Sequence, residues 1–180
     1  HASLIDGTLS PLQRDMAVIT DGERISAVVT DAALGTAQLE GAKQVDLTGE
    51  YLLPGYIDTH QHLATPPDRP EAEARLKRDI YTGITGTRDM ADDIRQIADI
   101  TRAARVGEIP SPDINSGALM AGPGVFEDPR TQASAQGAVA GQVLWEQAID
   151  HSTDRARAVA RAKGTYAKAV KIYADRPGDL

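Results

Sequence analysis

Two histidines separated by one residue carry the clearest chemical signal in the sequence. Residues 58–62 read Asp-Thr-His-Gln-His and directly follow an apolar segment that contains a Pro-Gly pair. Side chains alternate between the two faces of a strand, so Asp58, His60 and His62 are expected on one face and Gln61 on the other. Two imidazoles on one face can bind a single divalent ion. Two surface histidines are the alternative, and the preceding apolar strand favours the metal site.

A lysine in the last apolar segment is the second candidate. Lys171 lies between Val170 and Ile172, in a stretch typical of a strand that is covered on both faces. Burial disfavours an ammonium group and lowers its pKa toward the neutral amine. The neutral amine can react with carbon dioxide to give a carbamate, which can bridge two metal ions. A lysine that reaches solvent or pairs with a carboxylate is the alternative, and the residues alone favour it.

The elements that must position these residues alternate between strands and helices after residue 50. Strands are predicted at residues 51–57, 84–90, 113–120 and 167–174. Helices are predicted at residues 70–81, at 92–106, and from an N-cap signal at 152–154 through Lys163. The residues of the second helix expected to face inward are Ile94, Ile97, Ala98, Ile100 and Ala104. Four strand–helix units in series imply an α/β fold with a parallel sheet and right-handed crossovers.

Residues 1–50 are predicted to form a separate β segment. A hairpin signal joins strands at residues 16–20 and 25–29 through an Asp-Gly pair, which supplies the positive φ angles of a tight turn. Residues 44–47 are predicted to form a further strand, and no helix is expected. The simplest architecture is a small β-sandwich segment or a partial barrel, followed by an α/β domain over residues 51–180.

Residues 121–150 interrupt the alternation of strands and helices. They contain several glycines and the only Trp and the only Phe of the chain. A segment of this length inside an α/β domain indicates a lid or a binding loop. A surface excursion with a short helix of its own is an equal alternative.

The composition excludes several other chemistries. The 180 residues include 19 Lys and Arg against 26 Asp and Glu, a net charge of −7, and no Cys. An acidic chain has no general attraction for a phosphate backbone or an anionic membrane, so no nucleic-acid partner is expected. Without Cys there are no disulfides, thiolate zinc sites, iron–sulfur clusters or cysteine nucleophiles. No apolar run approaches the ~18–20 residues that span a bilayer.

The string at residues 52–62 closely resembles the first barrel strand of the amidohydrolase superfamily of metal-dependent hydrolases. Residues 4–7, 82–90 and 170–172 are similar to segments of its imidazolonepropionase-like and prolidase-like branch, in the expected order. The Pro-Gly-x-Ile-Asp-x-His-x-His string is specific, and the other segments are supportive only. The resemblance implies that the α/β domain is the first half of a (β/α)8 TIM-type barrel.

The resemblance implies a role for each matched residue. His60 and His62 match the histidines that bind the more buried metal. Lys171 matches the carboxylated lysine that bridges two metals, which reverses the preference stated above. The implied cofactors are two divalent ions, with zinc favoured, and carbon dioxide as the carbamate on Lys171. The residues implied to lie near the metals or the substrate pocket are Asp58, Asp89, Met120 and Tyr173.

The family pattern also contains a histidine after the fifth and the sixth strand and an aspartate after the eighth. We expect these residues beyond residue 180, so no catalytic proton shuttle is expected among the residues given. His151 precedes a predicted helix and is expected to be an exposed loop residue. The implied partners are a C-terminal half of the same enzyme, on the same or a separate chain, and further copies in a homo-oligomer.

The implied activity is hydrolysis of an amide C–N bond by a metal-bound hydroxide, in a small substrate such as a dipeptide or an N-acyl amino acid. Ester or lactone hydrolysis and a mononuclear deaminase of the same superfamily are alternatives, and Lys171 argues against the deaminase. A non-catalytic barrel scaffold is the alternative from another class. The presence of all three residues, His60, His62 and Lys171, argues against the scaffold.

Overall fold

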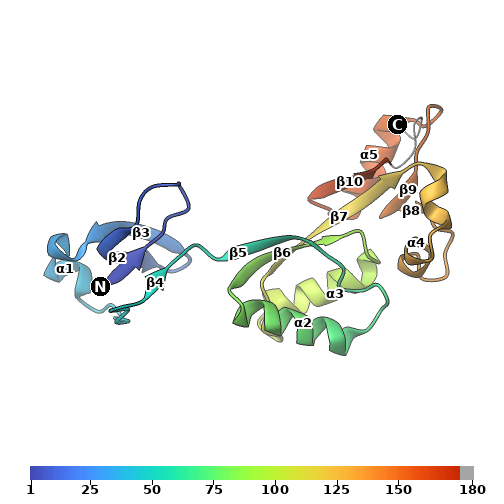
Figure 1. Ribbon diagram of the computed structural model, residues 1–180. Helices are drawn as coiled ribbons and strands as arrows, with labels where there is room; N and C mark the ends of the chain where they lie inside the picture. The colour runs from blue at the N-terminus through green and yellow to red at the C-terminus, as the bar shows by residue number, and fades with distance from the viewer. Residues whose placement is uncertain (175–180) are drawn as a thin grey trace. The chain divides into compact units, whose positions relative to one another are not determined.

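The computed structural model describes residues 1–174, which fall into two compact units. The first unit comprises residues 1–54, and the second begins at Gly55. Figure 1 shows the elements of both units along the chain. Within the described residues, no helix combines the length and the apolar character that a membrane crossing needs.

The first unit is built on one four-stranded sheet with the order β3-β2-β1-β4. Its strands are β1 (Ala2–Leu4), β2 (Gln13–Asp21), β3 (Arg24–Thr30) and β4 (Tyr51–Leu52). The predicted hairpin is confirmed, because β2 and β3 pair antiparallel and Gly22 in the turn has a φ of 56°. A 3-10 turn, η1 (Asp31–Ala33), and a short helix, α1 (Thr36–Leu39), follow it; neither was expected from the sequence.

The predicted strand at residues 44–47 does not form. The Asp46 side chain instead accepts hydrogen bonds from the Thr48 backbone N–H at 2.9 Å and from the Thr48 hydroxyl at 2.6 Å. Glu50 N donates to Leu47 O at 2.9 Å, so the segment turns tightly before β4. The described residues of the first unit therefore form a single sheet, and the predicted β-sandwich is not confirmed.

The apolar segment at residues 51–57 is not one strand, as predicted, but parts of two. β4 pairs with β1 in the first unit, and β5 (Tyr56–Gln61) pairs with β6 in the second. Pro54 has no N–H to donate to a ladder, and a Cβ on Gly55 would lie 2.0 Å from the Thr85 hydroxyl oxygen. The boundary between the units therefore falls at Pro54–Gly55, later than predicted. Nor is β5 covered on both faces, since Tyr56 and Ile57 are 61% and 71% exposed.

The second unit contains the predicted parallel strands and helices in the predicted order. Its parallel strands are β5, β6 (Ile84–Met90), β7 (Asp113–Ala121) and β10 (Ala169–Tyr173). Its main helices are α2 (Arg69–Tyr81), α3 (Ile94–Arg105) and α5 (Arg155–Lys163). Each pair of neighbouring strands among these four is parallel, which confirms a mixed α/β fold.

Residues 121–150 are neither a free lid nor a simple surface excursion. They form η2 (Pro123–Glu127), α4 (Pro129–Ser134), β8 (Gln142–Val143) and β9 (Glu146–Ala148). β9 pairs parallel with β7 at Leu119–Ala121, while β6 pairs with β7 only as far as Gly117. β10 pairs with one edge of β7. β6 and β9 both pair with the opposite edge, β6 along its first part and β9 along its last part. The segment is thereby anchored in the sheet.

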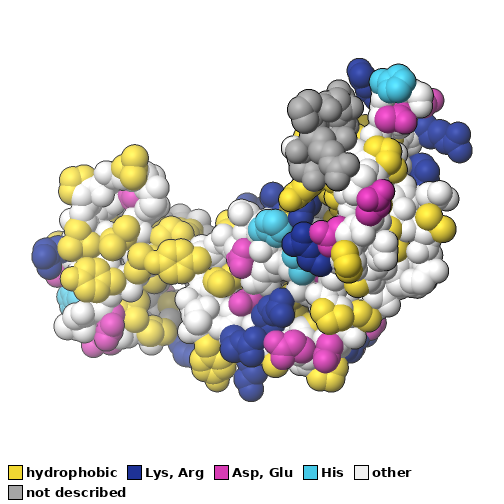
Figure 2. All heavy atoms as spheres, turned by 45° about the vertical axis from the view of Figure 1, so that its right-hand side comes forward, with side chains coloured by type: hydrophobic (Ala, Val, Ile, Leu, Met, Phe, Trp, Pro, Cys, Tyr) yellow, Lys and Arg dark blue, Asp and Glu magenta, His cyan; other side chains and the backbone are white. Residues whose placement is uncertain are grey.

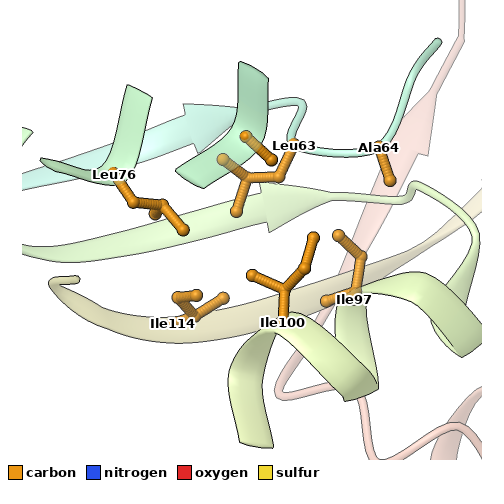
Figure 3. Packing of buried hydrophobic residues seen from close by; sticks show 7 residues of the cluster. Leu63, Ala64, Leu76, Ile97, Ile100 and Ile114 are labelled. Carbon is orange, nitrogen blue, oxygen red and sulfur yellow. The ribbon is translucent and has the colours of Figure 1, made fainter. Parts of the chain in front are cut away.

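The main core of the second unit lies between the sheet and helices α2 and α3. Asp68 caps α2 by accepting a hydrogen bond from Glu71 N at 3.0 Å, and Gly107 ends α3 with a φ of 74°. The buried cluster contains Leu63, Ala64, Ala72, Leu76, Ile97, Ile100 and Ile114 (Figure 3). On α3 the prediction was wrong at one position: Ala98 is exposed, and Ala103 is buried instead because it lies one turn from Ile100.

Replacing Leu76 with alanine tests this core. Leu76 is fully buried, so Leu76→Ala is expected to lower the free energy of unfolding by about 2–5 kcal/mol. Ile80→Ala on the same helix is the matched control, because Ile80 is 41% exposed and its truncation leaves little cavity. Urea titrations of both variants measure the difference. Equal losses of stability would contradict the packing described here.

Candidate metal centre

A cleft of about 800 Å³ lies at the carboxyl ends of the parallel strands of the second unit. Figure 2 shows histidine, basic and acidic side chains gathered side by side near the middle of the picture. The cleft also receives side chains from η2 and α4, so residues 121–150 help to shape it. The titratable side chains that line the cleft include those of His60, His62, Asp92, Glu146, Lys171 and Tyr173.

Three nitrogen atoms from two distant parts of the chain meet in this cleft. His60 Nε2 lies 3.3 Å from His62 Nε2 and 3.3 Å from Lys171 Nζ. The two imidazole rings are inclined at 60° to each other. A tetrahedral zinc ion with metal–nitrogen bonds of about 2.0–2.1 Å holds its donors about 3.4 Å apart. The spacing of His60 and His62 therefore fits two ligands of one divalent ion.

The buried carboxylate of Asp92 fixes the orientation of His62. His62 Nδ1 lies 2.7 Å from Asp92 Oδ1, so Nδ1–H donates to the carboxylate and the Nε2 lone pair faces the cleft. Asp92 also accepts hydrogen bonds from Ala64 N at 2.6 Å and from the Thr65 hydroxyl at 2.7 Å. Burial alone would raise the pKa of Asp92, but the bonds from His62, Ala64 and Thr65 outweigh it and lower the pKa.

Sequence reasoning missed Asp92 as a site residue. The residue was assigned only to the start of helix α3, whereas Asp93 is the N-cap and Asp92 lies in the turn before it. Ala91 in this turn has a φ of 81°, a left-handed conformation that non-glycine residues adopt at a cost. The acidic pair Asp92-Asp93, one residue beyond the end of strand β6, was the available signal, because carboxyl ends of parallel strands share one edge of the sheet.

Asp89 supports the segment that carries His62 through hydrogen bonds from the backbone. Its carboxylate accepts from Leu63 N and from Asp92 N, each at 3.0 Å. Burial and the neighbouring charge of Asp92 raise the pKa of Asp89 well above its usual value. The implied place of Asp89 near the metals or the substrate pocket stays a prediction.

Asp58 does not share the cleft with the histidines. The four residues of β5 from Asp58 to Gln61 lie opposite three of β6, from Thr87 to Asp89, so an extra residue interrupts the alternation of faces. Asp58 accepts from His60 N at 2.9 Å and from Gln61 Nε2 at 2.9 Å. Gln61 faces away from the cleft, as expected, and also donates to Asp79 at 2.8 Å. Asp58 therefore acts on the backbone of β5.

The electrostatics of the cleft favour neutral nitrogen groups. Burial lowers the pKa of His60, and the charges of Lys171 and His62 lower it further. Burial also lowers the pKa of Lys171; the charge of Asp92 opposes this shift, and that of Arg130 adds to it. A neutral imidazole is the form that binds metal, and a neutral amine is the form that reacts with carbon dioxide.

The remaining two predicted residues lie on opposite faces of the sheet. Tyr173 lines the cleft together with Lys171, two residues before it on β10. Met120 packs against Ala158 and Ala162 of α5, on the other face of β7, so the predicted place in the pocket is wrong. Leu119 lines the cleft instead, because successive side chains of a strand alternate.

Glu146 is a second cleft residue that sequence reasoning missed. The side chain is 1% exposed, and burial raises its pKa to about 7. Only its proximity to Trp145 in an irregular segment could have drawn attention to it, and that signal is weak. Arg130, also at the cleft, is held by Asp128 through a bond of 2.7 Å between Nη2 and Oδ2.

Comparison with known proteins finds relatives by sequence over part of the chain. No family model matches. The chain is 41% identical over 70 residues to an imidazolonepropionase of Arthrobacter sp. (strain FB24), covering 38% of this chain and 16% of the relative. It is 37% identical over 101 residues to an imidazolonepropionase of Paenarthrobacter aurescens (strain TC1), covering 51% and 22%. An adenine deaminase of Desulfitobacterium hafniense (strain Y51) is 44% identical over 46 residues, covering 23% and 8%.

Solved structures extend the likeness to nearly the whole chain. A candidate prolidase from Bifidobacterium longum matches with a TM-score of 0.64 and 21% identity, covering 98% of this chain and 40% of that one. A Xaa-Pro dipeptidase with bound methionine matches with a TM-score of 0.61 and 20% identity, covering 95% and 45%. At these identities the likeness shows the fold alone.

The chain thus spans less than half the length of each protein it matches. The sequence relatives, the shared fold and the His-x-His motif at the end of β5 agree with one another. Over the part of their length that the chain spans, these relatives and structural neighbours indicate the amidohydrolase superfamily.

Proposed function

We propose that the protein is a metal-dependent hydrolase that cleaves an amide C–N bond in a small substrate. The observation that carries the proposal is the meeting of His60 Nε2, His62 Nε2 and Lys171 Nζ at spacings of 3.3 Å. A bound divalent ion lowers the pKa of water and polarises a carbonyl oxygen. His60 and His62 would hold such an ion, and zinc suits this nitrogen-rich donor set.

Lys171 supports a centre with two ions. Its pKa is lowered by burial, so a larger fraction of the side chain is neutral than for a lysine in water. Carbamylation of the amine would give a carboxylate that reaches beyond Nζ, into a cleft that has the volume of a small-molecule site. We infer that two zinc ions share this carbamate, with His60 and His62 on one of them.

The proposed substrates are small amides such as dipeptides or N-acyl amino acids. The relatives named imidazolonepropionase and the Xaa-Pro dipeptidase of similar fold support this class. The cleft volume of about 800 Å³ is within the ~300–1,000 Å³ typical of sites for molecules of this size.

We also propose that the second unit is the first half of a (β/α)8 barrel. The chain as a whole matches 45% and 40% of the two solved chains of similar fold. Tyr56 and Ile57 on β5, and Ile172 on β10, are exposed apolar residues on the outermost of these strands. A C-terminal half would cover them and supply the remaining ligands and the aspartate that moves the proton.

A mononuclear deaminase is the second candidate, because an adenine deaminase is among the sequence relatives. A single ion would need His60 and His62 but no carbamate. The partly buried, pKa-lowered amine of Lys171 beside His60 favours the hydrolase. Production of ammonia from adenine by the zinc-loaded protein, without cleavage of any amide, would support the deaminase.

Metal analysis with variants tests the proposed centre. The complete protein is expected to hold two zinc ions, and Lys171→Ala is expected to leave one or none and to abolish amide hydrolysis. His60→Ala and His62→Ala are each also expected to lower the zinc content below two ions, because each removes a proposed direct ligand. Elemental analysis after dialysis and an assay of amide cleavage measure both effects.

Lys168→Ala is the matched control for the lysine variant. Lys168 precedes β10 and does not line the cleft, so its loss should change neither zinc content nor activity. Retention of two zinc ions and full activity in Lys171→Ala would contradict the binuclear hydrolase.

The orientation of His62 gives a separate prediction. Asp92→Asn is expected to weaken zinc binding about 10–100-fold, because it removes the charged acceptor of His62 Nδ1–H. Asp58→Asn is expected to have a smaller effect, because Asp58 bonds to the His60 backbone and not to a ring. Competition with a chromophoric chelator measures both affinities. An equal loss in the two variants would contradict the role assigned to Asp92.

A further inference from the structure

Glu146 lies on the floor of the cleft, two strands away from Lys171. In the sheet, Leu119 of β7 pairs with Glu146 of β9 on one edge and with Lys171 of β10 on the other. Side chains in one such row point to the same face of a parallel sheet. All three residues line the cleft. With strands about 4.8 Å apart, the two Cα atoms are about 10 Å apart, a span suited to a small substrate.

The carboxyl group of Glu146 is buried without a full set of partners. The side chain is 1% exposed, and its Oε2 atom has no hydrogen-bond partner in the described part of the chain. Two arginines near the cleft are already engaged, Arg130 by Asp128 and Arg95 by Asp93. A buried acceptor that stays unpaired is costly, so such a group is typical of a site that a ligand completes.

The charges around Glu146 indicate which ligand group would complete it. Burial and the negative charge of the neighbouring Asp92 both raise the pKa of Glu146. The Ser134 hydroxyl, the polar group beside Glu146, donates to Ala91 O at 2.9 Å. A second anion would be repelled here, whereas a positively charged nitrogen would be attracted by both carboxylates and would donate to Oε2.

We propose that Glu146 is a specificity-determining residue that binds an ammonium or other cationic N–H group of the substrate beside the scissile carbonyl. The inference rests on the proposed function, which places that carbonyl at His60, His62 and Lys171. It distinguishes two substrate classes that the metal centre alone would treat alike. Free dipeptides carry an α-ammonium group next to the carbonyl, and N-acyl amino acids do not.

Binding of two matched ligands to the zinc-loaded complete protein tests the inference. The first is the ketomethylene analogue of L-alanyl-L-alanine, in which a CH2 group replaces the scissile N–H. The second is the same compound with a methyl group in place of the ammonium. Calorimetry is expected to show the ammonium ligand binding roughly 10- to 100-fold more tightly, as expected for a hydrogen bond to a charged group.

Variants assign this preference to one carboxylate. Glu146→Gln is expected to remove most of the preference while leaving binding of the methyl ligand nearly unchanged. Glu127→Gln is the matched control, because Glu127 is an exposed carboxylate at the rim of the same cleft. It should retain the preference. A thermal melt of each variant shows whether the fold is intact.

The possible outcomes separate the inference from the proposed function. Equal affinity for the two ligands, no binding of either, or an equal loss of both in Glu146→Gln would overturn the role of Glu146. A preference that Glu127→Gln removes as fully as Glu146→Gln would overturn it as well. If the preference is present but neither L-alanyl-L-alanine nor isobutyryl-L-alanine is hydrolysed, Glu146 keeps its role in binding and the proposed hydrolysis fails.

Discussion

The hydrogen bond between His62 Nδ1 and the buried carboxylate of Asp92 is the contact on which the rest of the site depends. It selects the tautomer of His62 and directs Nε2 toward His60. Asp92 is in turn held by the backbone of Ala64 and by the N–H-to-carboxylate bond to Asp89. Two buried carboxylates are tolerated side by side because the pKa of one is lowered and that of the other is raised. Contacts within the chain therefore fix the orientation in which His62 faces the cleft.

The pairing of β7 with three different strands places the other half of the site. β7 pairs with β6 at its amino end, with β9 beyond Gly117, and with β10 along the opposite edge. Leu119 thus stands between an acid from β9 and the lysine of β10. The pairing of Leu119 with both neighbours brings Lys171 close to His60 and also places the acidic side chain of Glu146 in the cleft. Position along one strand therefore brings both Lys171 and Glu146 to the cleft.

The sequence predicted the parts of the molecule that depend on local pattern. Helical periodicity, N-caps and apolar runs located the four parallel strands and three helices, and the His-x-His spacing located the two histidines whose Nε2 atoms lie 3.3 Å apart at the cleft. Sequence reasoning failed for residues whose place in the site depends on contacts with distant parts of the chain. Asp92 and Glu146 gain their roles from neighbours far along the chain, and a bulge in β5 turns Asp58 away from the cleft. Met120 was assigned to the cleft because a strand alone does not show which face a sheet presents to its helices.

The most direct test of the account is X-ray absorption at the zinc edge of the zinc-loaded complete protein. The account predicts scattering from two imidazole rings with metal–nitrogen distances of about 2.0–2.1 Å, and a second metal about 3.5–4 Å away. In Asp92→Asn, the imidazole contribution should fall, because His62 loses its fixed orientation. A spectrum without imidazole scattering, or one that Asp92→Asn and His62→Ala leave unchanged, would contradict the central claim.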